Sequence, residues 1–559
     1  MNVAAYVAQF LISKNVHHVF GYQGGAILKL VDEMIATEQI SFVQHYHEQG
    51  AAFAADAYSR IKGTIGVAIA TSGPGATNLI TGIVNAQLDS IPTLFITGQD
   101  YLANITADNG ARQNGFQDLD ISTIVESVTK YAVLVTDPAK IRYELECAYY
   151  HATQGRPGAV LLDIPIDVQF AEVDVDKLEG FTPPQAQAAP EPMDLSEAMQ
   201  ALQQARRPLI LVGGGVRLSD ACAQLDEFVR LSGIPVISTL NGLDLVERGF
   251  GFAGLHGHTA ANLAAQNADL LLVLGARLGQ RQVGKIPQKY TKARIIHIDI
   301  DPLELRRVFP QEIAIQADLK VALEVMNSLL ASLTLPDHSR WRNIIANWTE
   351  KYHHNVLLNR EGLDPVSVVE KMMPFLQRGA VVTCDVGQNQ MWVAQAFRVK
   401  EGQRLLNSVG LGSMGYSLPA AIGAKVAESE RQVVAFMGDG GLQINLQELM
   451  LLRVRRLGIK CVVFNNNTLG MIREVQLRYY KENYYGTNPS EYGCVNLQLL
   501  AQAYGLGYRR IQTLDEVMAL EQVFADSAPY IIEVGLVLDS KLTNRYDEAA
   551  CFEAERLDD

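Results

Sequence analysis

The sequence predicts an α/β protein built from three doubly wound parallel-sheet domains, and three observations support this prediction. First, 559 residues are too many for a single hydrophobic core. Second, short apolar runs such as residues 66–70 and 433–437 end in glycine-rich turns and alternate with helical patterns, as buried parallel strands do. Third, proline-bearing stretches at 180–195 and 331–365 divide these runs into three groups. We therefore expect domains at 1–175, 190–335 and 360–545, followed by an acidic tail at 546–559.

The composition argues against several classes of protein. The chain is 48% hydrophobic and 19% charged, which is typical of globular proteins, and its apolar runs are too short to span a bilayer. A net charge of −14 argues against nucleic acid or an anionic membrane as the partner. The six cysteines lack the paired spacing of a zinc site or a disulfide framework, which fits a reducing compartment. Because residues 1–16 lack the pattern of a signal peptide, we expect a cytoplasmic protein.

The first domain shows glycine turns at the ends of its predicted strands. A helix over residues 10–12 precedes strands at 18–20, 41–43 and 66–70. Turns with the sequences Gly21-Tyr22-Gln23-Gly24-Gly25 and Thr71-Ser72-Gly73-Pro74-Gly75 follow two of these strands. An alanine-rich helix begins near Glu48, and an acid in a first helical turn is favourable without any catalytic role. The pattern predicts a ligand-binding edge where the strands end.

The middle domain repeats this pattern with a different set of turns. Apolar runs at 208–212, 270–274 and 295–300 are followed by Gly213-Gly214-Gly215, Gly275-Ala276-Arg277 and Asp301-Pro302. A triple glycine is most often only a turn. Its place after a buried strand, with Asp299 closing a later strand, also fits a nucleotide site.

The third domain carries polar residues directly after two predicted strands. Residues 433–437 run into Gly438-Asp439-Gly440, and residues 460–464 run into Asn465-Asn466-Asn467. The spacing between them leaves room for one crossover helix, so both clusters should meet at the carboxyl edge of a parallel sheet. Oxygen atoms of Asp439, Asn466 and the carbonyl near Thr468 could hold Mg²⁺ on a diphosphate, whose oxygens would face the glycine N–H groups. The alternative is an ordinary turn.

These motifs, taken in order, resemble one family, the thiamine diphosphate (ThDP)-dependent acetohydroxyacid (acetolactate) synthases. The shared stretches span roughly residues 10 to 540 and include 47–52, 71–78, 89–92, 116–117, 385–388, 410–415 and 438–470. The resemblance implies a pyrimidine-binding domain at 1–175, a middle FAD-type domain at 190–335 and a diphosphate-binding domain at 360–545. It also implies a homodimer or tetramer, with cofactor sites between the first domain of one subunit and the third domain of another.

The resemblance assigns roles to individual residues. Glu48 matches the carboxylate that lies against the aminopyrimidine ring, and Met414 matches the apolar residue that holds the cofactor bent. Around the reacting carbon, the matching residues are Gly24, Phe116, Gln117 and Lys130, although Lys130 also reads as surface. The cofactor contacts would be Thr71, Pro74, Asn78, Val386, Gly387, Gln388, Asn389, Gly412, Met414, Gly438, Asp439, Gly440, Gly441, Asn466, Gly470 and Met471. The metal ligands would be Asp439, Asn466 and Thr468.

The resemblance also implies FAD in the middle domain, in a role without electron transfer. The matching residues are Gly213, Gly214, Gly215, Thr239, Leu240, His256, Gly257, Gly275, Arg277, Arg281, Asp299, Ile300 and Asp318. The chain departs from the family at Gly279-Gln280, where two acidic residues are usual, and this departure leaves the retention of FAD open.

The implied reaction is decarboxylation of pyruvate and transfer of the remaining two-carbon unit to a carbonyl acceptor, with 2-acetolactate as the product from a second pyruvate. Two departures widen the choice of acceptor: Val475 stands where the biosynthetic synthases carry a tryptophan, and Gln23 where they carry a proline. The alternatives are transfer to ketones such as a nucleotide-linked keto sugar, a flavin-dependent pyruvate oxidase, and a non-catalytic binding protein. A regulatory subunit is possible within the family, but no feature of the sequence indicates one.

Overall fold

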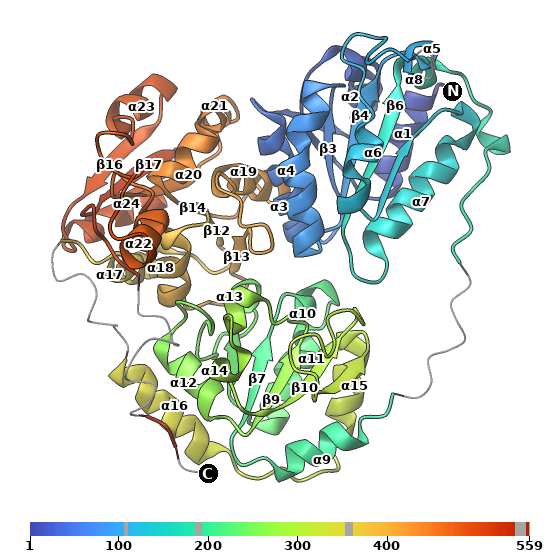
Figure 1. Ribbon diagram of the computed structural model, residues 1–559. Helices are drawn as coiled ribbons and strands as arrows, with labels where there is room; N and C mark the ends of the chain where they lie inside the picture. The colour runs from blue at the N-terminus through green and yellow to red at the C-terminus, as the bar shows by residue number, and fades with distance from the viewer. Residues whose placement is uncertain (106–109, 185–192, 353–361, 543–554, 558–559) are drawn as a thin grey trace.

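The computed structural model describes residues 1–105, 110–184, 193–352, 362–542 and 555–557, and it contains three parallel sheets (Figure 1). Each sheet is covered by helices, as the sequence predicts for an α/β protein. Half of the linker at 180–195, part of the boundary at 331–365 and most of the tail at 546–559 lie outside the described residues. No helix within the described ranges is long and apolar enough to cross a membrane.

The first domain is a six-stranded sheet in the order β2-β1-β3-β4-β6-β5, with every neighbouring pair parallel. The strands are β1 His18–Tyr22, β2 Ser41–Gln44, β3 Gly66–Ala70, β4 Thr93–Gln99, β5 Tyr131–Leu134 and β6 Ala159–Pro165. The helices are α1 Val3–Ser13, α2 Leu28–Ala36, α3 Glu48–Lys62, α4 Pro74–Asp89, α5 Leu102–Ile105, α6 Ile121–Val125, α7 Ile141–Thr153 and α8 Ile166–Phe170. The strands expected at 18–20, 41–43 and 66–70 are confirmed.

The middle domain is a five-stranded parallel sheet in the order β11-β10-β9-β7-β8. The strands are β7 Pro208–Val212, β8 Val236–Ser238, β9 Leu270–Leu274, β10 Arg294–Asp299 and β11 Ile313–Gln316. The helices are α9 Ser196–Gln204, α10 Gly215–Leu218, α11 Cys222–Ser232, α12 Thr259–Asn267, α13 Gln280–Val283, α14 Pro287–Tyr290, α15 Leu319–Leu330 and α16 Ser339–Lys351.

The middle domain extends beyond residue 335 because it includes helix α16. Its Trp341 and Trp348 are buried against the core of this domain, and the Trp341 indole donates to the carbonyl of Pro208 at 3.0 Å. The described part of the tail reaches the same place, since Glu555 accepts from the Trp348 indole. The proline-bearing stretch at 331–365 therefore contains a helix of the middle domain as well as a connection.

The third domain is a six-stranded parallel sheet in the order β13-β12-β14-β15-β17-β16. The strands are β12 Val381–Cys384, β13 Arg404–Asn407, β14 Val433–Gly438, β15 Lys460–Asn465, β16 Gly507–Ile511 and β17 Tyr530–Gly535. The helices are α17 Pro365–Met372, α18 Gln388–Ala396, α19 Ser417–Ala427, α20 Asp439–Ile444, α21 Leu449–Val454, α22 Gly470–Tyr479, α23 Leu497–Tyr504 and α24 Glu521–Ala525. Its strand order, counted within the domain, is the same as that of the first domain.

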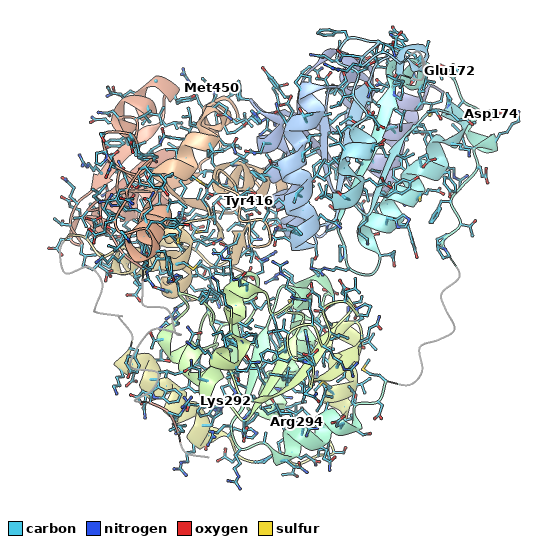
Figure 2. The ribbon with its side chains drawn as sticks, viewed as in Figure 1. Glu172, Asp174, Lys292, Arg294, Tyr416 and Met450 are labelled. Atoms are coloured by element: carbon cyan, nitrogen blue, oxygen red, sulfur yellow. The ribbon has the colours of Figure 1, made fainter. Side chains whose placement is uncertain are left out.

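The first and third domains pack through α3 and α19, which lie side by side in Figure 1. Both helices are rich in small residues, so their backbones approach closely: a side chain at Gly423 would meet the Ala54 carbonyl oxygen at 2.0 Å. Tyr416, labelled at this junction in Figure 2, donates its hydroxyl to Asp56 at 2.9 Å. The shared interface brings the carboxyl edge of each sheet toward the other domain.

Candidate active site

The carboxyl edge of the third sheet brings together the two polar clusters predicted from the sequence. Asp439 begins α20 directly after β14, and Asn466 directly follows β15, which pairs in parallel with β14. Asp439 is 2% exposed, and its Oδ2 atom has no hydrogen-bond partner among the described residues. Burial raises the pKa of this carboxyl to about 7. A buried carboxylate oxygen without a partner is suited to a bound cation.

Amide side chains and close backbone surround Asp439. Gln388 Oε1 accepts from Asn466 Nδ2 at 3.3 Å, and a side chain at Gly470 would meet this oxygen at 2.0 Å. Asn389 lies near Gly438, where a Cβ atom would be 3.5 Å from its Nδ2. The helices α18, α20 and α22 all begin at this edge, so free N–H groups in their first turns can donate to a phosphate.

The donor set fits Mg²⁺ with a diphosphate rather than an ion held by protein alone. Within the described ranges there is no group of three or more His, Cys, Asp or Glu residues that could hold a metal. One carboxylate, one amide and one carbonyl leave room for phosphate oxygens and water, as Mg²⁺ prefers. The Thr468 hydroxyl donates to the Thr487 carbonyl at 2.7 Å. The Thr468 carbonyl accepts from the Gly470 N–H at 3.0 Å, and its second lone pair can bind a metal ion.

A loop between β13 and α19 places Gly412 and Met414 beside this edge. Gly412 and Gly415 have φ of +71° and +81°, values that favour glycine. Gly412 approaches the Val386 side chain, and the Met414 methyl group lies near Gly440. The buried Asp385 carboxylate accepts from the Gly415 N–H at 2.9 Å and 3.0 Å, and burial raises its pKa to about 7.

Asp385 also lies close to Gly441, where a side chain would meet its Oδ2 atom at 2.5 Å. Met471 packs partly buried against the core of the third domain. The structure thus gathers the predicted third-domain residues at one edge of the sheet.

The carboxyl edge of the first sheet gathers Glu48 with the predicted glycine turns. Glu48 is 6% exposed at the start of α3, and its Oε2 atom accepts from Asn78 Nδ2 at 2.9 Å. A side chain at Gly75 would lie 3.3 Å from Glu48 Oε1 and 2.8 Å from the Thr71 methyl group. Pro74 is the first residue of α4, in the same turn. Glu48 is therefore held by the first domain itself.

The turn at residues 71–75 is approached by Gly24 and by Gln117, the neighbour of Phe116. A side chain at Gly24 would meet Thr71 Cβ at 2.5 Å, and one at Gly73 would meet Gln117 Cβ at 2.9 Å. Gln117 has φ of +62°. Phe116 is 85% exposed, so the described residues cover little of its ring.

Hydrogen bonds within one chain link the two edges. Asn445 Nδ2 donates to Gln49 Oε1 at 3.2 Å and to the Gly415 carbonyl at 2.8 Å. His45 Nδ1 of the first domain and Glu448 Oε2 of the third domain also form a buried contact, at 2.9 Å. The pair gives His45 a structural contact between the first and third domains.

The structure does not bring Lys130 to the edge where Glu48 lies. Lys130 directly precedes β5, at the amino ends of the parallel strands. Its ammonium group donates to the carbonyls of Gln154 and Arg156 at 2.8 Å and 2.7 Å. Burial lowers its pKa. The structure therefore does not support the predicted place of Lys130 around the reacting carbon, and its contacts hold the loop that follows α7.

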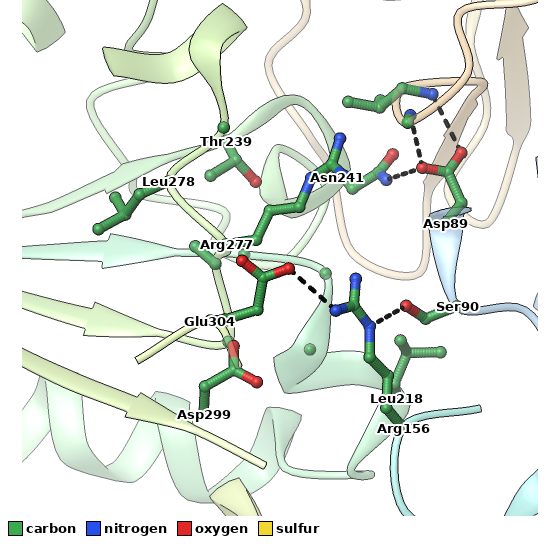
Figure 3. Close-up of a pocket in the computed structure, with 18 of the residues that line it drawn as sticks. Asp89, Ser90, Arg156, Leu218, Thr239, Asn241, Arg277, Leu278, Asp299 and Glu304 are labelled. Atoms are coloured by element: carbon green, nitrogen blue, oxygen red, sulfur yellow. Dashed lines mark hydrogen bonds and ion pairs between the residues drawn. The ribbon is translucent and has the colours of Figure 1, made fainter. Parts of the chain in front are cut away.

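The middle domain contains a cavity of about 360 Å³, which Figure 3 shows in close-up. Eleven of the thirteen residues predicted for FAD line it: Gly213, Gly214, Gly215, Thr239, Leu240, Gly275, Arg277, Arg281, Asp299, Ile300 and Asp318. Gly279 and Gln280 also line it, so the departure from the family lies within the cavity wall.

His256 and Gly257 do not line the cavity, contrary to the prediction. The His256 carbonyl accepts from Gln395 Nε2 at 2.7 Å, and a side chain at Gly257 would meet the backbone of residues 252–254. Both residues therefore shape the turn before α12.

Several residues that lie at these sites have no role among the sequence predictions. The end of α4, with Asp89 and Ser90, lines the middle cavity together with Arg156. Asp89 and Ser90 belong to the motif at 89–92. The motif does not show that α4 ends there, at the wall of the cavity. The Tyr492 hydroxyl accepts from Gln443 and lies beside Gly440, near Asp439, and no motif pointed to it.

Comparison with known proteins agrees with the three-domain division. The chain matches the thiamine pyrophosphate enzyme N-terminal TPP binding domain at residues 1–124, the central domain at 195–326 and the C-terminal TPP binding domain at 385–534. It is 36% identical to the acetolactate synthase large subunit of Cyanidium caldarium, covering 94% of this chain and 91% of the relative. It is also 36% identical to the acetolactate synthase isozyme 2 large subunit of Escherichia coli (strain K12), covering 96% of each.

Fold, site and comparisons define a thiamine diphosphate enzyme with three α/β domains, of the class that forms carbon–carbon bonds. Within that class, the chain belongs to the ThDP-dependent acetolactate synthase family.

Proposed function

We propose that this enzyme decarboxylates pyruvate and transfers the remaining two-carbon unit to a carbonyl acceptor, forming 2-acetolactate when the acceptor is a second pyruvate. The names of the relatives support the reaction. The observation that carries the proposal is the buried Asp439 Oδ2 atom, which has no hydrogen-bond partner in the described part of the chain and lies at the edge where three helices begin. This arrangement suits a diphosphate bound through Mg²⁺.

Bound ThDP supplies a thiazolium carbon that can act as a nucleophile and accept the negative charge left when CO₂ departs. Asp439, Asn466 and the Thr468 carbonyl would hold the metal ion. Backbone N–H groups at Gly387 and Gly438 would bind the diphosphate, with Gln388 and Asn389 beside them. These groups orient the cofactor without taking part in bond changes.

Glu48 would hold a proton at its carboxyl group, facing the aminopyrimidine ring. Asn78 fixes the orientation of this carboxyl through Oε2, which leaves Oε1 available. Met414 supplies apolar surface on the opposite domain, and Gln117 can donate to an oxygen that gains negative charge. Gln117 lies next to Gly73, in the turn that also approaches Glu48.

We infer that the middle cavity holds FAD and that the flavin takes no part in electron transfer, because decarboxylation and ligation need no net oxidation. The backbone at Gly213 and Gly215 packs directly against the backbone at Gly275. The absence of side chains at these three positions lets a diphosphate approach the backbone there. Arg277 and Arg281 add positive charge to the cavity wall, and Asp299 adds a carboxylate suited to a ribose hydroxyl. This set fits a flavin dinucleotide even with Gly279-Gln280 in the wall.

The acceptor range is the second question, and Val475 and Gln23 favour ketones as additional acceptors. Val475 lies on α22, directly after the predicted metal loop, and is 38% exposed. Gln23 follows β1 at the edge that carries Glu48. A valine in place of a bulky aromatic ring leaves space, and a glutamine adds a hydrogen-bond donor.

We propose that the enzyme is at least a homodimer, with each ThDP site between two subunits. Phe116 is 85% exposed on the first domain, and Leu411, Met414 and Ile472 are 39%, 37% and 50% exposed on the third. Apolar side chains around both halves of the site would be covered by a second copy.

Product analysis tests the proposed reaction. The enzyme is incubated with pyruvate, ThDP and Mg²⁺, with and without a cyclic ketone, and the products are identified by NMR. We expect one acetolactate and one CO₂ from two pyruvates, and a ketone adduct when the ketone is present. Acetate formed with consumption of O₂ would indicate the oxidase instead, and unchanged pyruvate would refute the proposal.

A further inference from the structure

Asp89, the last residue of α4, binds the loop that carries Gly412 and Met414. Its Oδ2 atom accepts from the Val409 N–H at 3.0 Å, and its Oδ1 atom accepts from the Gly410 N–H at 2.8 Å. The side chain is 3% exposed and forms an ion pair with Arg60 at 3.1 Å. The loop of the third domain is thus fixed at its base by a carboxylate of the first domain.

The same face of α4 holds the loop at two further points. The Ser408 hydroxyl donates to Asn85 Oδ1 at 2.5 Å and accepts from the Ser413 N–H at 3.0 Å. Gly410 packs so closely on Leu88 that a side chain there would lie 2.7 Å from Leu88 Cβ. Residues 408–410 are therefore held by α4, which begins in the turn beside Glu48, while Gly415 at the far end of the loop is held by Asp385 and Asn445.

The end of α4 also forms part of the middle cavity. Leu88, Asp89, Ser90, Val409 and Gly410 all line it, opposite the glycine turns of the middle domain. Figure 3 shows the Asp89 carboxylate at this wall, with Ser90 and Arg156 beside it. Arg156 donates to Ser90 Oγ at 2.8 Å and pairs with Asp301 and Glu304 of the middle domain at 2.9 Å and 3.0 Å.

We propose that Asp89 is a positioning residue that couples occupancy of the middle cavity to the loop 408–415, and through this loop to the ThDP site. A flavin dinucleotide in the cavity would pack against the end of α4 and restrict the Asp89 side chain to the rotamer that accepts both N–H groups. The loop would then hold Gly412 and Met414 in place. This inference rests on the proposed function, since it takes FAD as the ligand of the cavity and these two residues as cofactor contacts.

Hydrogen–deuterium exchange of the peptide covering residues 408–415 tests the coupling, without ThDP and independently of activity. It is measured by mass spectrometry in the wild type and in Asp89→Asn, with and without added FAD. Added FAD should slow exchange in the wild type. In Asp89→Asn, exchange should be roughly tenfold faster, because the NH₂ group that replaces one carboxylate oxygen cannot accept from the second N–H group, and added FAD should have little effect.

Two further variants distinguish a loss of the FAD effect on the loop 408–415 from a general increase in exchange. Asp364→Asn removes a carboxylate that accepts the Ser367 N–H at the start of α17, and it should leave the 408–415 peptide unchanged. Ser408→Ala breaks the other anchor but keeps Asp89, so exchange should rise while the effect of FAD remains. Circular dichroism verifies that each variant is folded.

The proposal is overturned if Asp89→Asn exchanges like the wild type, if FAD protects the loop equally in both, or if FAD has no effect on the wild-type loop. A wild type that makes no acetolactate would instead refute the proposed function, and it would leave these exchange rates as they are.

Discussion

Glu48 is the residue on which the proposed proton chemistry depends. It is nearly buried, and Asn78 holds one of its two carboxylate oxygens. A glutamine at this position can still accept from Asn78 but cannot hold an ionisable proton. We expect Glu48→Gln to bind ThDP and to exchange the thiazolium C2 proton about 10² to 10⁴ times more slowly. NMR of the bound cofactor after transfer to deuterated buffer measures this rate, and exchange at the wild-type rate would remove Glu48 from the role.

Asp163 provides a test of the electrostatics away from the cofactor. It is 1% exposed, accepts from Thr97 Oγ1 and Gln99 Nε2, and burial raises its pKa from 3.8 to about 7. Because the folded pKa exceeds the unfolded value, the group favours folding fully below about pH 4. That contribution is lost as the pH rises toward 7.

Asp163→Asn should remove this dependence. Its free energy of unfolding, relative to the wild type, should increase by about 1.4 kcal/mol per pH unit between these limits and then stay level. Urea unfolding at several pH values measures the difference, and a difference that does not change with pH would show that the carboxyl titrates normally.

At the level of single residues, the sequence was a good guide where a side chain follows a strand. Glu48, Asp439 and Asn466 lie at carboxyl edges, as their spacing predicted. It was a poor guide for Lys130, whose motif does not reveal that the residue precedes a strand and lies at the opposite edge. The predictions for His256 and Gly257 have a related weakness. Their motif marks the turn before α12, and it does not show that this turn lies away from the lining of the cavity.

At the level of elements, α22 tests the acceptor range. We expect Val475→Trp to fill space over the site and narrow the range of ketones accepted, since filling even one methylene of a pocket changes selection by about 1–3 kcal/mol. The measurement is a competition between pyruvate, 2-ketobutyrate and a cyclic ketone as acceptors, with pyruvate as donor. Leu477→Trp, which changes an equally exposed position on the same helix, is the control. Strong selection of 2-ketobutyrate by the wild type, with no ketone product, would show that the interpretation of Val475 and Gln23 is wrong.

The strands themselves were predictable because buried parallel strands form apolar runs that end in turns. The strand order was not, because order depends on which crossover packs on which face. The first and third domains share one order although no residue-level repeat links them. Helix α16 was missed as part of the middle domain, because its two buried tryptophans lie in a stretch with boundary-like composition.

At the level of the whole molecule, complementation tests whether sites lie between subunits. Glu48→Gln and Asp439→Ala should each be nearly inactive. If each site takes Glu48 from one subunit and Asp439 from the other, a mixed dimer contains one intact site. Equal mixing with subunit exchange should restore about a quarter of wild-type activity. No restoration in verified mixed dimers would place both residues of a site in one chain.

The central claim is that Asp439 anchors ThDP through a divalent ion at the edge of the third sheet. Its Oδ2 atom is buried and has no hydrogen-bond partner among the described residues, which suits a bound cation. Calorimetric titration of ThDP in the presence of Mg²⁺ tests the claim most directly, with Asp364→Ala as a control that loses a carboxylate elsewhere in the same domain. We predict that Asp439→Ala weakens ThDP binding by about a hundredfold or more while the control binds normally. Unchanged affinity in Asp439→Ala would contradict the account.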